Sequence, residues 1–220
     1  MEPLSPPDLA NTITGFCTIL AGVIPLLLCR WLGPQPGRWL FVYWCIFITG
    51  LPTVGFHGWG TSWLRVSDTG SNLLLAWAIQ LAVLGDYYIP KTRLRMAVVS
   101  GIVNLVAIAQ MIREEVIGAK VYLVDLGDFG GFHPGESVLI LDSILVVGLM
   151  VAQRRQIAPE AMPLLRVVIF CFLVGVGLAS ATNTTLHARI WSYHALWHIV
   201  SATGFVFLWA FNHKRLHPTG

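Results

Sequence analysis

Seven continuous apolar runs dominate this sequence, and each is about as long as a helix that crosses a bilayer. They lie near residues 11–31, 39–58, 68–88, 94–112, 136–153, 163–183 and 193–212. At 1.5 Å of rise per residue, ~20 residues cover the ~30 Å hydrocarbon core of a membrane. The runs are continuous rather than alternating, which favours helices over barrel strands. We therefore predict an all-α integral membrane protein, a single domain over residues 1–220 built as a bundle of seven transmembrane helices.

The composition excludes the common soluble classes. Hydrophobic residues make up 55% of the chain and charged residues 11%, whereas soluble domains carry about 25% charged residues. We therefore expect neither a soluble enzyme nor a nucleic-acid partner. The four cysteines form no CxxC pair, so their spacing predicts neither a disulfide framework nor a thiolate zinc site.

The distribution of basic residues predicts how the bundle is oriented in the membrane. With the N-terminus outside, ten of the 14 Lys and Arg residues fall on the inner side. The positive-inside rule thus predicts an outside N-terminus and a cytoplasmic C-terminus.

The first charges, Glu2 and Asp8, are acidic, so we expect no secretory signal peptide. The long loop 113–135 then lies outside, as a lid, an interfacial segment or a solvated connector. The sequence does not indicate which membrane holds the protein, and it leaves the oligomeric state open, a homo-oligomer included.

Histidines inside the apolar runs are the most informative polar residues, because a polar group in hydrocarbon is costly and is retained mainly where it has a partner or a task. His194 and His198 begin the seventh run, one helical turn apart, and therefore share a helix face. His57 ends the second run, which crosses in the opposite sense, so all three lie at one depth. Three imidazoles supply three corners of a tetrahedron and leave the fourth open, as catalytic zinc requires. We predict a Zn²⁺ site at these histidines.

Two further polar residues are predicted at the same depth. Asp68 opens the third run, eleven residues after His57, and Thr53 lies one turn before His57 on the same face. Pro52 lacks a backbone N–H, so we expect the helix to loosen there. The alternative to a metal site is a hydrogen-bonded His/Asp cluster that ties the helices together.

These residues form a signature: TVGFH at 53–57, an aspartate at position 68 and HALWH at 194–198. It resembles the signature of the alkaline ceramidases. It also resembles the wider superfamily of seven-span, metal-dependent membrane hydrolases that includes the adiponectin receptors and GPI-lipid remodelling proteins. The resemblance covers the span count and topology of the whole chain, but the match to the family's motifs rests on five residues. It implies zinc-dependent cleavage of the amide bond of ceramide-like lipids to a sphingoid base and a fatty acid.

The resemblance also implies roles for the site residues. Zinc would lower the pKa of its bound water to about 7. Asp68 would be the general base and would later return the proton to the departing amine. The metal and the Thr53 hydroxyl would stabilise the oxyanion. The membrane lipid substrate would enter sideways from the bilayer.

The chain departs from the family pattern in three places. Thr53 stands where serine is usual, which keeps the hydroxyl but adds a methyl group. Thr69 replaces the acidic residue that often follows the family aspartate, which leaves amide and ester lipids both open as substrates. The acidic cluster that some relatives use for calcium is missing, so we expect no calcium site. Two alternatives therefore stand: a lipid-ester hydrolase of the GPI-remodelling type, and a seven-span receptor with a structural metal.

Three other polar residues are expected inside the bundle. Asn72 lies one turn after Asp68 and is expected to orient it. Ser201 lies one turn beyond His198 and is expected to line the cavity. Asp142 stands in the middle of the fifth run and should face the interior, with a partner that the sequence does not identify.

Overall fold

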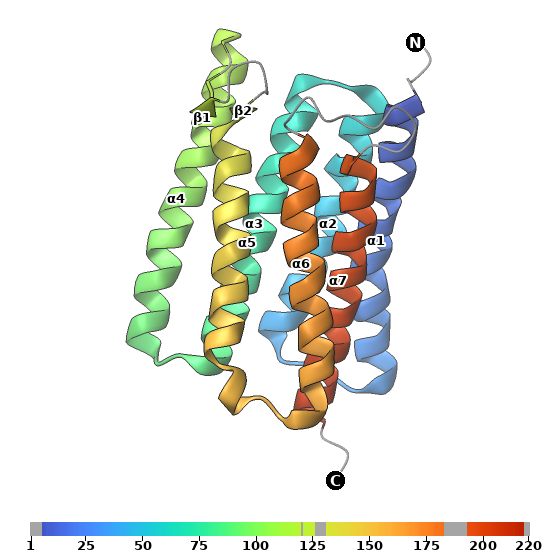
Figure 1. The fold of residues 1–220 in the computed structure, drawn as a ribbon, viewed down its shortest axis with the longest axis vertical. Coiled ribbons are helices and arrows are strands. Elements are labelled where there is room, and N and C mark those ends of the chain that lie inside the picture. The colour runs from blue at the N-terminus through green and yellow to red at the C-terminus, as the bar shows by residue number, and fades with distance from the viewer. Residues whose placement is uncertain (1–5, 120, 126–130, 183–192, 218–220) are drawn as a thin grey trace.

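The residues that the structure describes form a bundle of seven α-helices that run alongside one another (Figure 1). A computed structural model describes residues 6–119, 121–125, 131–182 and 193–217 of the chain. The helices are α1 (Pro6–Leu32), α2 (Gly37–Trp59), α3 (Ser62–Tyr87), α4 (Pro90–Ile117), α5 (Pro134–Ala152), α6 (Met162–Thr182) and α7 (Tyr193–Leu216). Two short antiparallel strands, β1 (Val124–Asp125) and β2 (Gly131–Phe132), lie between α4 and α5. Two 3₁₀ turns, η2 (Arg154–Gln156) and η3 (Pro159–Ala161), join α5 to α6.

Within the described part of the chain, six helices are long and apolar enough to cross a membrane: all except α3. The protein is therefore an integral, multi-pass membrane protein. The physical reason for the exception lies in the position of α3, which packs against α2, α4 and α5. Its polar residues Asp68 and Gln80 are buried among these neighbours rather than exposed to lipid.

The helices extend beyond the predicted apolar runs. α3 begins at Ser62, so Asp68, at the start of the predicted apolar run near 68–88, lies in the second turn of the helix. α4 continues to Ile117, past the predicted end at residue 112. Hydropathy marks only the part of a helix that suits hydrocarbon, whereas helical hydrogen bonding continues into the headgroup layer. α2 also runs through Pro52 without a break. Residue 183 of the predicted sixth span, and residues 120 and 126–130 of the predicted loop, lie outside the described residues.

A tight turn brings the end of α2 next to the start of α3. Gly60 terminates α2 in the left-handed region at φ 67°, and its N–H donates to the carbonyl of Phe56 at 2.7 Å. Only Gly60 and Thr61 separate the two helices. Glycine suits this position because a side chain there would be strained. The turn places the last residues of α2 beside the first two turns of α3.

Asp142 ties the peripheral helix α4 into the bundle. It is buried, as the sequence predicted for an acidic residue in this run. Its Oδ1 accepts a hydrogen bond from Gln80 Nε2 of α3 at 2.7 Å, and its Oδ2 accepts one from Asn104 Nδ2 of α4 at 2.8 Å. The hydroxyl of Ser100 donates to Gln80 in turn. Hydrogen bonds of this kind hold helices together in lipid, where apolar burial alone gives little drive for association.

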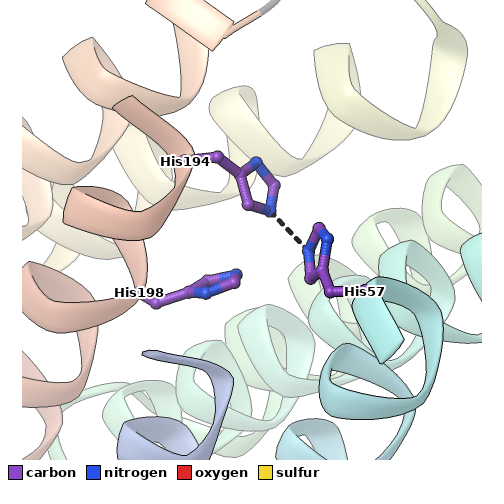
Figure 2. A group of neighbouring side chains, drawn as sticks. All are labelled: His57, His194 and His198. Carbon is purple, nitrogen blue, oxygen red and sulfur yellow. Dashed lines mark hydrogen bonds between the residues drawn. The ribbon is translucent and has the colours of Figure 1, made fainter. Parts of the chain in front are cut away.

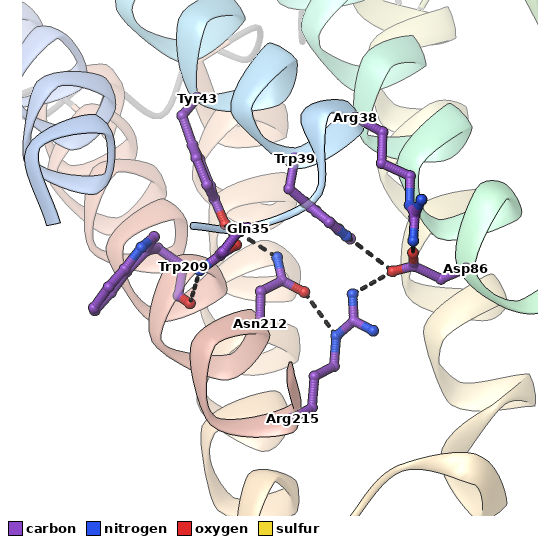
Figure 3. A network of polar contacts seen from close by, with 8 residues as sticks. All are labelled: Gln35, Arg38, Trp39, Tyr43, Asp86, Trp209, Asn212 and Arg215. Atoms are coloured by element: carbon purple, nitrogen blue, oxygen red, sulfur yellow. Dashed lines mark hydrogen bonds and ion pairs between the residues drawn. The ribbon is translucent and has the colours of Figure 1, made fainter. Parts of the chain in front are cut away.

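At the end of the bundle opposite the Gly60 turn, Asp86 of α3 joins three helices (Figure 3). Its carboxylate pairs with Arg38 of α2 and with Arg215 of α7, and it accepts a hydrogen bond from Trp39 Nε1 at 2.8 Å. Arg215 also donates to Asn212 at 2.9 Å. The network fixes the C-terminal end of α7 against α2 and α3.

Candidate metal centre

Three histidine rings from two helices point toward one another near one end of the bundle (Figure 2). His57 lies in the last turn of α2, and His194 and His198 lie in the first two turns of α7. The ring centroids are 4.7 Å apart for His57 and His194, 5.3 Å for His57 and His198, and 4.6 Å for His194 and His198. The predicted meeting of these three residues is therefore present in the structure.

The arrangement suits a metal ion. One ligand atom from each histidine lies within 4.8 Å of the other two. The Nε2 atoms of His57 and His194 are 3.0 Å apart. In a tetrahedral site the nitrogens, about 2.0–2.1 Å from the ion, lie roughly 3.3 Å from one another. The 3.0 Å separation between His57 and His194 is therefore close to that of two nitrogens bound to one tetrahedral ion.

A buried, unsatisfied nitrogen supports the same conclusion. His198 is 3% exposed, and its Nε2 has no hydrogen-bond partner among the described residues. Leaving a buried polar atom unpaired costs about 1–3 kcal/mol. A cation at the centre of the three rings would satisfy this atom, whereas a hydrogen-bonded cluster leaves it unpaired.

Asp68 is held beside this group by two side chains. The hydroxyl of Thr53 lies 2.5 Å from Asp68 Oδ1 and 2.9 Å from the carbonyl of Thr49. Asn72 Nδ2 lies 3.4 Å from Asp68 Oδ1 and 3.0 Å from the Asp68 carbonyl. Thr53 and Asn72 thus both donate hydrogen bonds to Asp68 Oδ1.

A cavity of about 280 Å³ begins at this site and continues between the helices. Its polar end includes Asp68, Thr53, His194 and His198. Apolar residues of α3, α5 and α6 line the remainder, among them Ala76, Ile79, Leu139, Ile140, Phe172 and Val176. Ser201, predicted to line a cavity, does so. The shape offers a polar reaction site joined to a space for a hydrocarbon chain.

Thr14 of α1 also belongs to the site, although it was not predicted from the sequence: its hydroxyl lies 3.0 Å from His198 Nδ1. A signal for it exists in the sequence. Asn11, Thr14 and Thr18 are spaced three and four residues apart in an apolar helix, which places them on one face, and all three are buried. Arg65 and Glu136 also line the cavity and were not predicted as site residues.

The fold and the site define the class of this chain: a helical, multi-pass membrane protein with a buried group of three histidines suited to a metal ion. No protein-family model matches the chain, and no curated protein matches its sequence.

Proposed function

We propose that this protein is a zinc-dependent intramembrane hydrolase of the alkaline ceramidase type, which cleaves the amide bond of ceramide-like lipids to a sphingoid base and a fatty acid. The proposal rests on one observation above all: three imidazoles converge beside a carboxylate at the polar end of an otherwise apolar cavity. A structural metal needs neither the carboxylate nor the cavity. The resemblance of the motifs around Thr53, Asp68 and His194 to those of the ceramidases supports the same activity.

In this proposal zinc, held by His57, His194 and His198, would acidify a water molecule and polarise the substrate carbonyl. Asp68 accepts the proton of the attacking water and delivers it to the departing amine, so one carboxylate serves as base and then as acid. Asn72 and Thr53 hold Oδ1, which leaves Oδ2 to exchange the proton. For the Thr53 hydroxyl to stabilise the oxyanion as well, it must rotate away from Asp68 when substrate binds.

We further propose that all seven helices span the membrane, with the N-terminus outside. The less apolar α3 packs against α2, α4 and α5, and its polar residues Asp68 and Gln80 are buried among these helices rather than exposed to lipid. The basic residues around Arg93, Arg154 and Lys214 then face the cytoplasm. The histidines lie in the last turn of α2 and the first two turns of α7. α7 begins at the end of the bundle where α1 also begins, and this orientation puts that end beneath the outer leaflet (Figure 1).

The lining of the cavity supports entry of the substrate from the bilayer. α5 and α6 both contribute apolar side chains to it, and these two helices pack against each other over little of their length. An acyl chain that moves sideways between them reaches the histidines without crossing water.

Elemental analysis of the purified protein beside His198→Ala tests the metal. We expect about one zinc per chain in the wild type, as for a single three-histidine site, and a large loss in the variant. Equal zinc in the two proteins, or none in either, would contradict the site.

A side-by-side assay on ceramide and on an ester phospholipid tests the reaction. We expect faster cleavage of ceramide, and a fall of about 10²–10⁴-fold in Asp68→Asn, since the general base is lost while the ligands remain. Faster cleavage of the ester identifies a lipid-ester hydrolase instead. Bound zinc with no cleavage of either lipid, and an unchanged stability of Asp68→Asn, identifies a receptor with a structural metal.

A further inference from the structure

Thr14 of α1 lies against the Nδ1 side of the His198 ring. Its Oγ1 is 3.0 Å from His198 Nδ1, although the two residues are 184 positions apart in the sequence. The same Oγ1 lies 2.8 Å from the carbonyl oxygen of Ala10 and 3.3 Å from that of Asn11. Thr14 is 5% exposed, so water does not compete for these bonds.

The single proton of the Thr14 hydroxyl decides the direction of these hydrogen bonds. A carbonyl oxygen only accepts, so the hydroxyl donates to the backbone of its own helix, a common arrangement for threonine within a helix. Its oxygen then faces His198 Nδ1 as an acceptor, and Nδ1 must carry the ring proton. The backbone of Asn11 also forms a hydrogen bond with this ring. In a neutral imidazole with the proton on Nδ1, the free lone pair is on Nε2.

We infer that Thr14 is a positioning residue for the metal: it sets the tautomer and orientation of His198, so that the Nε2 lone pair is directed at the ion. This inference deepens the proposed function and rests on the metal site within it. Nε2 is the atom of His198 that is buried without a partner among the described residues. Hydrogen-bond partners behind a metal-binding histidine commonly contribute about 10–100-fold to metal affinity.

A packing role alone would give Thr14 a different signature. Packing depends on volume and shape, so valine, which replaces the hydroxyl by a methyl group of similar size, would serve as well as threonine. The positioning role requires the hydroxyl, so serine would serve and valine would not. Thr18 provides a matched control, because it lies one turn further along the same face of α1, is also buried and also lines the cavity.

The test uses the full-length protein in detergent, with metal binding as the readout. Zinc affinity is measured by competition with a chromophoric chelator for the wild type, Thr14→Val, Thr14→Ser and Thr18→Val. Each protein is also loaded with Co²⁺, whose visible absorption reports the ligand geometry. We expect Thr14→Val to bind zinc about 10–100-fold more weakly and to shift the Co²⁺ spectrum. Thr14→Ser and Thr18→Val should stay within about threefold of the wild type.

Each outcome decides the inference. Equal zinc affinity and an unchanged Co²⁺ spectrum in Thr14→Val would overturn it and leave the proposed function standing. A wild type that binds zinc but cleaves no lipid would refute the proposed function, while a weaker Thr14→Val would still support the inference. If Thr14→Val does not fold, Thr14→Ser is the deciding variant. A zinc affinity and a Co²⁺ spectrum like those of the wild type would support the positioning role of the hydroxyl. A loss of zinc affinity as large as that expected for Thr14→Val would contradict it. A wild type that binds no metal overturns both.

Discussion

Thr53 and Asp68 are joined by a hydrogen bond of 2.5 Å between the last two turns of α2 and the second turn of α3. The turn at Gly60 and Thr61 makes this contact possible, because it brings the two helices side by side within two residues of chain. Thr53 thereby holds the carboxylate that we propose as the general base.

The first prediction concerns this hydrogen bond. Thr53→Val keeps the size of the side chain but removes the donor to Asp68, and Asn72 at 3.4 Å is a weaker substitute. We expect kcat for ceramide hydrolysis to fall about 10–100-fold, with zinc still at one per chain. Thr53→Ser keeps the hydroxyl and should stay within about threefold of the wild type. Undiminished turnover in Thr53→Val would show that Asp68 needs no such support.

The second prediction concerns the cavity. Ala76 lies in α3 about 12 Å beyond Asp68 along the helix axis, and it lines the cavity. Ala76→Phe should fill the space and lower the hydrolysis of long-chain ceramides at least about tenfold, because one lost methylene contact alone is worth about 1–3 kcal/mol in a hydrophobic pocket.

Short-chain substrates should be affected less, and the zinc content should not change. Ala109→Phe is the control, since Ala109 lies on the exposed face of α4. A uniform loss for all chain lengths would place the acyl chain elsewhere.

The third prediction concerns the network around Asp86. The Asp86 and Arg215 side chains are 3% and 10% exposed, so removal of the carboxylate leaves a buried guanidinium without its counter-charge. Asp86→Ala should lower the free energy of unfolding by about 3–5 kcal/mol, measured by chemical denaturation in detergent. Arg38 is 42% exposed, and solvent screens its pair with Asp86. Arg38→Gln should therefore cost about 1 kcal/mol or less. Similar losses in the two variants would contradict this account.

The fourth prediction concerns the close approach of α1 and α2. A Cβ at Gly22 would clash with the backbone nitrogen of Phe47, which cannot move aside as a flexible side chain can. Gly22→Ala should therefore push the helices apart, at a cost of about 1–3 kcal/mol. Thermal unfolding in detergent measures the loss, and the zinc affinity should fall too, because α1 carries Thr14.

Gly148→Ala provides the matched control in α5. No atom lies within 4 Å of a Cβ there, so alanine should leave the stability unchanged or raise it by about 0.5–1 kcal/mol through its better helix propensity. Equal losses at the two glycines would argue against a steric origin.

Much of the bundle, and the three histidines of the candidate site, could be predicted from the sequence. Helix period places His194 and His198 on one face, and the opposite directions of the second and seventh helices bring His57 to the same depth. These inferences depend on local periodicity and on the thickness of the bilayer, both of which can be read along a single chain. Helix ends were less accurate, as Asp68 shows, because polar residues at the membrane surface continue a helix without adding to its hydropathy.

The sequence by itself determined that the chain is a helical membrane protein with histidines grouped at one level of the bundle. Only the tertiary structure decided that Thr14 lies beside His198, that Asp142 meets Gln80 and Asn104, and that α3 packs against α2, α4 and α5. The physical reason is that these contacts depend on how far each helix is rotated about its axis and how it is shifted along its neighbour. Side-chain packing between helices sets that rotation and shift, so residues 184 positions apart can meet without any pattern linking them along the chain.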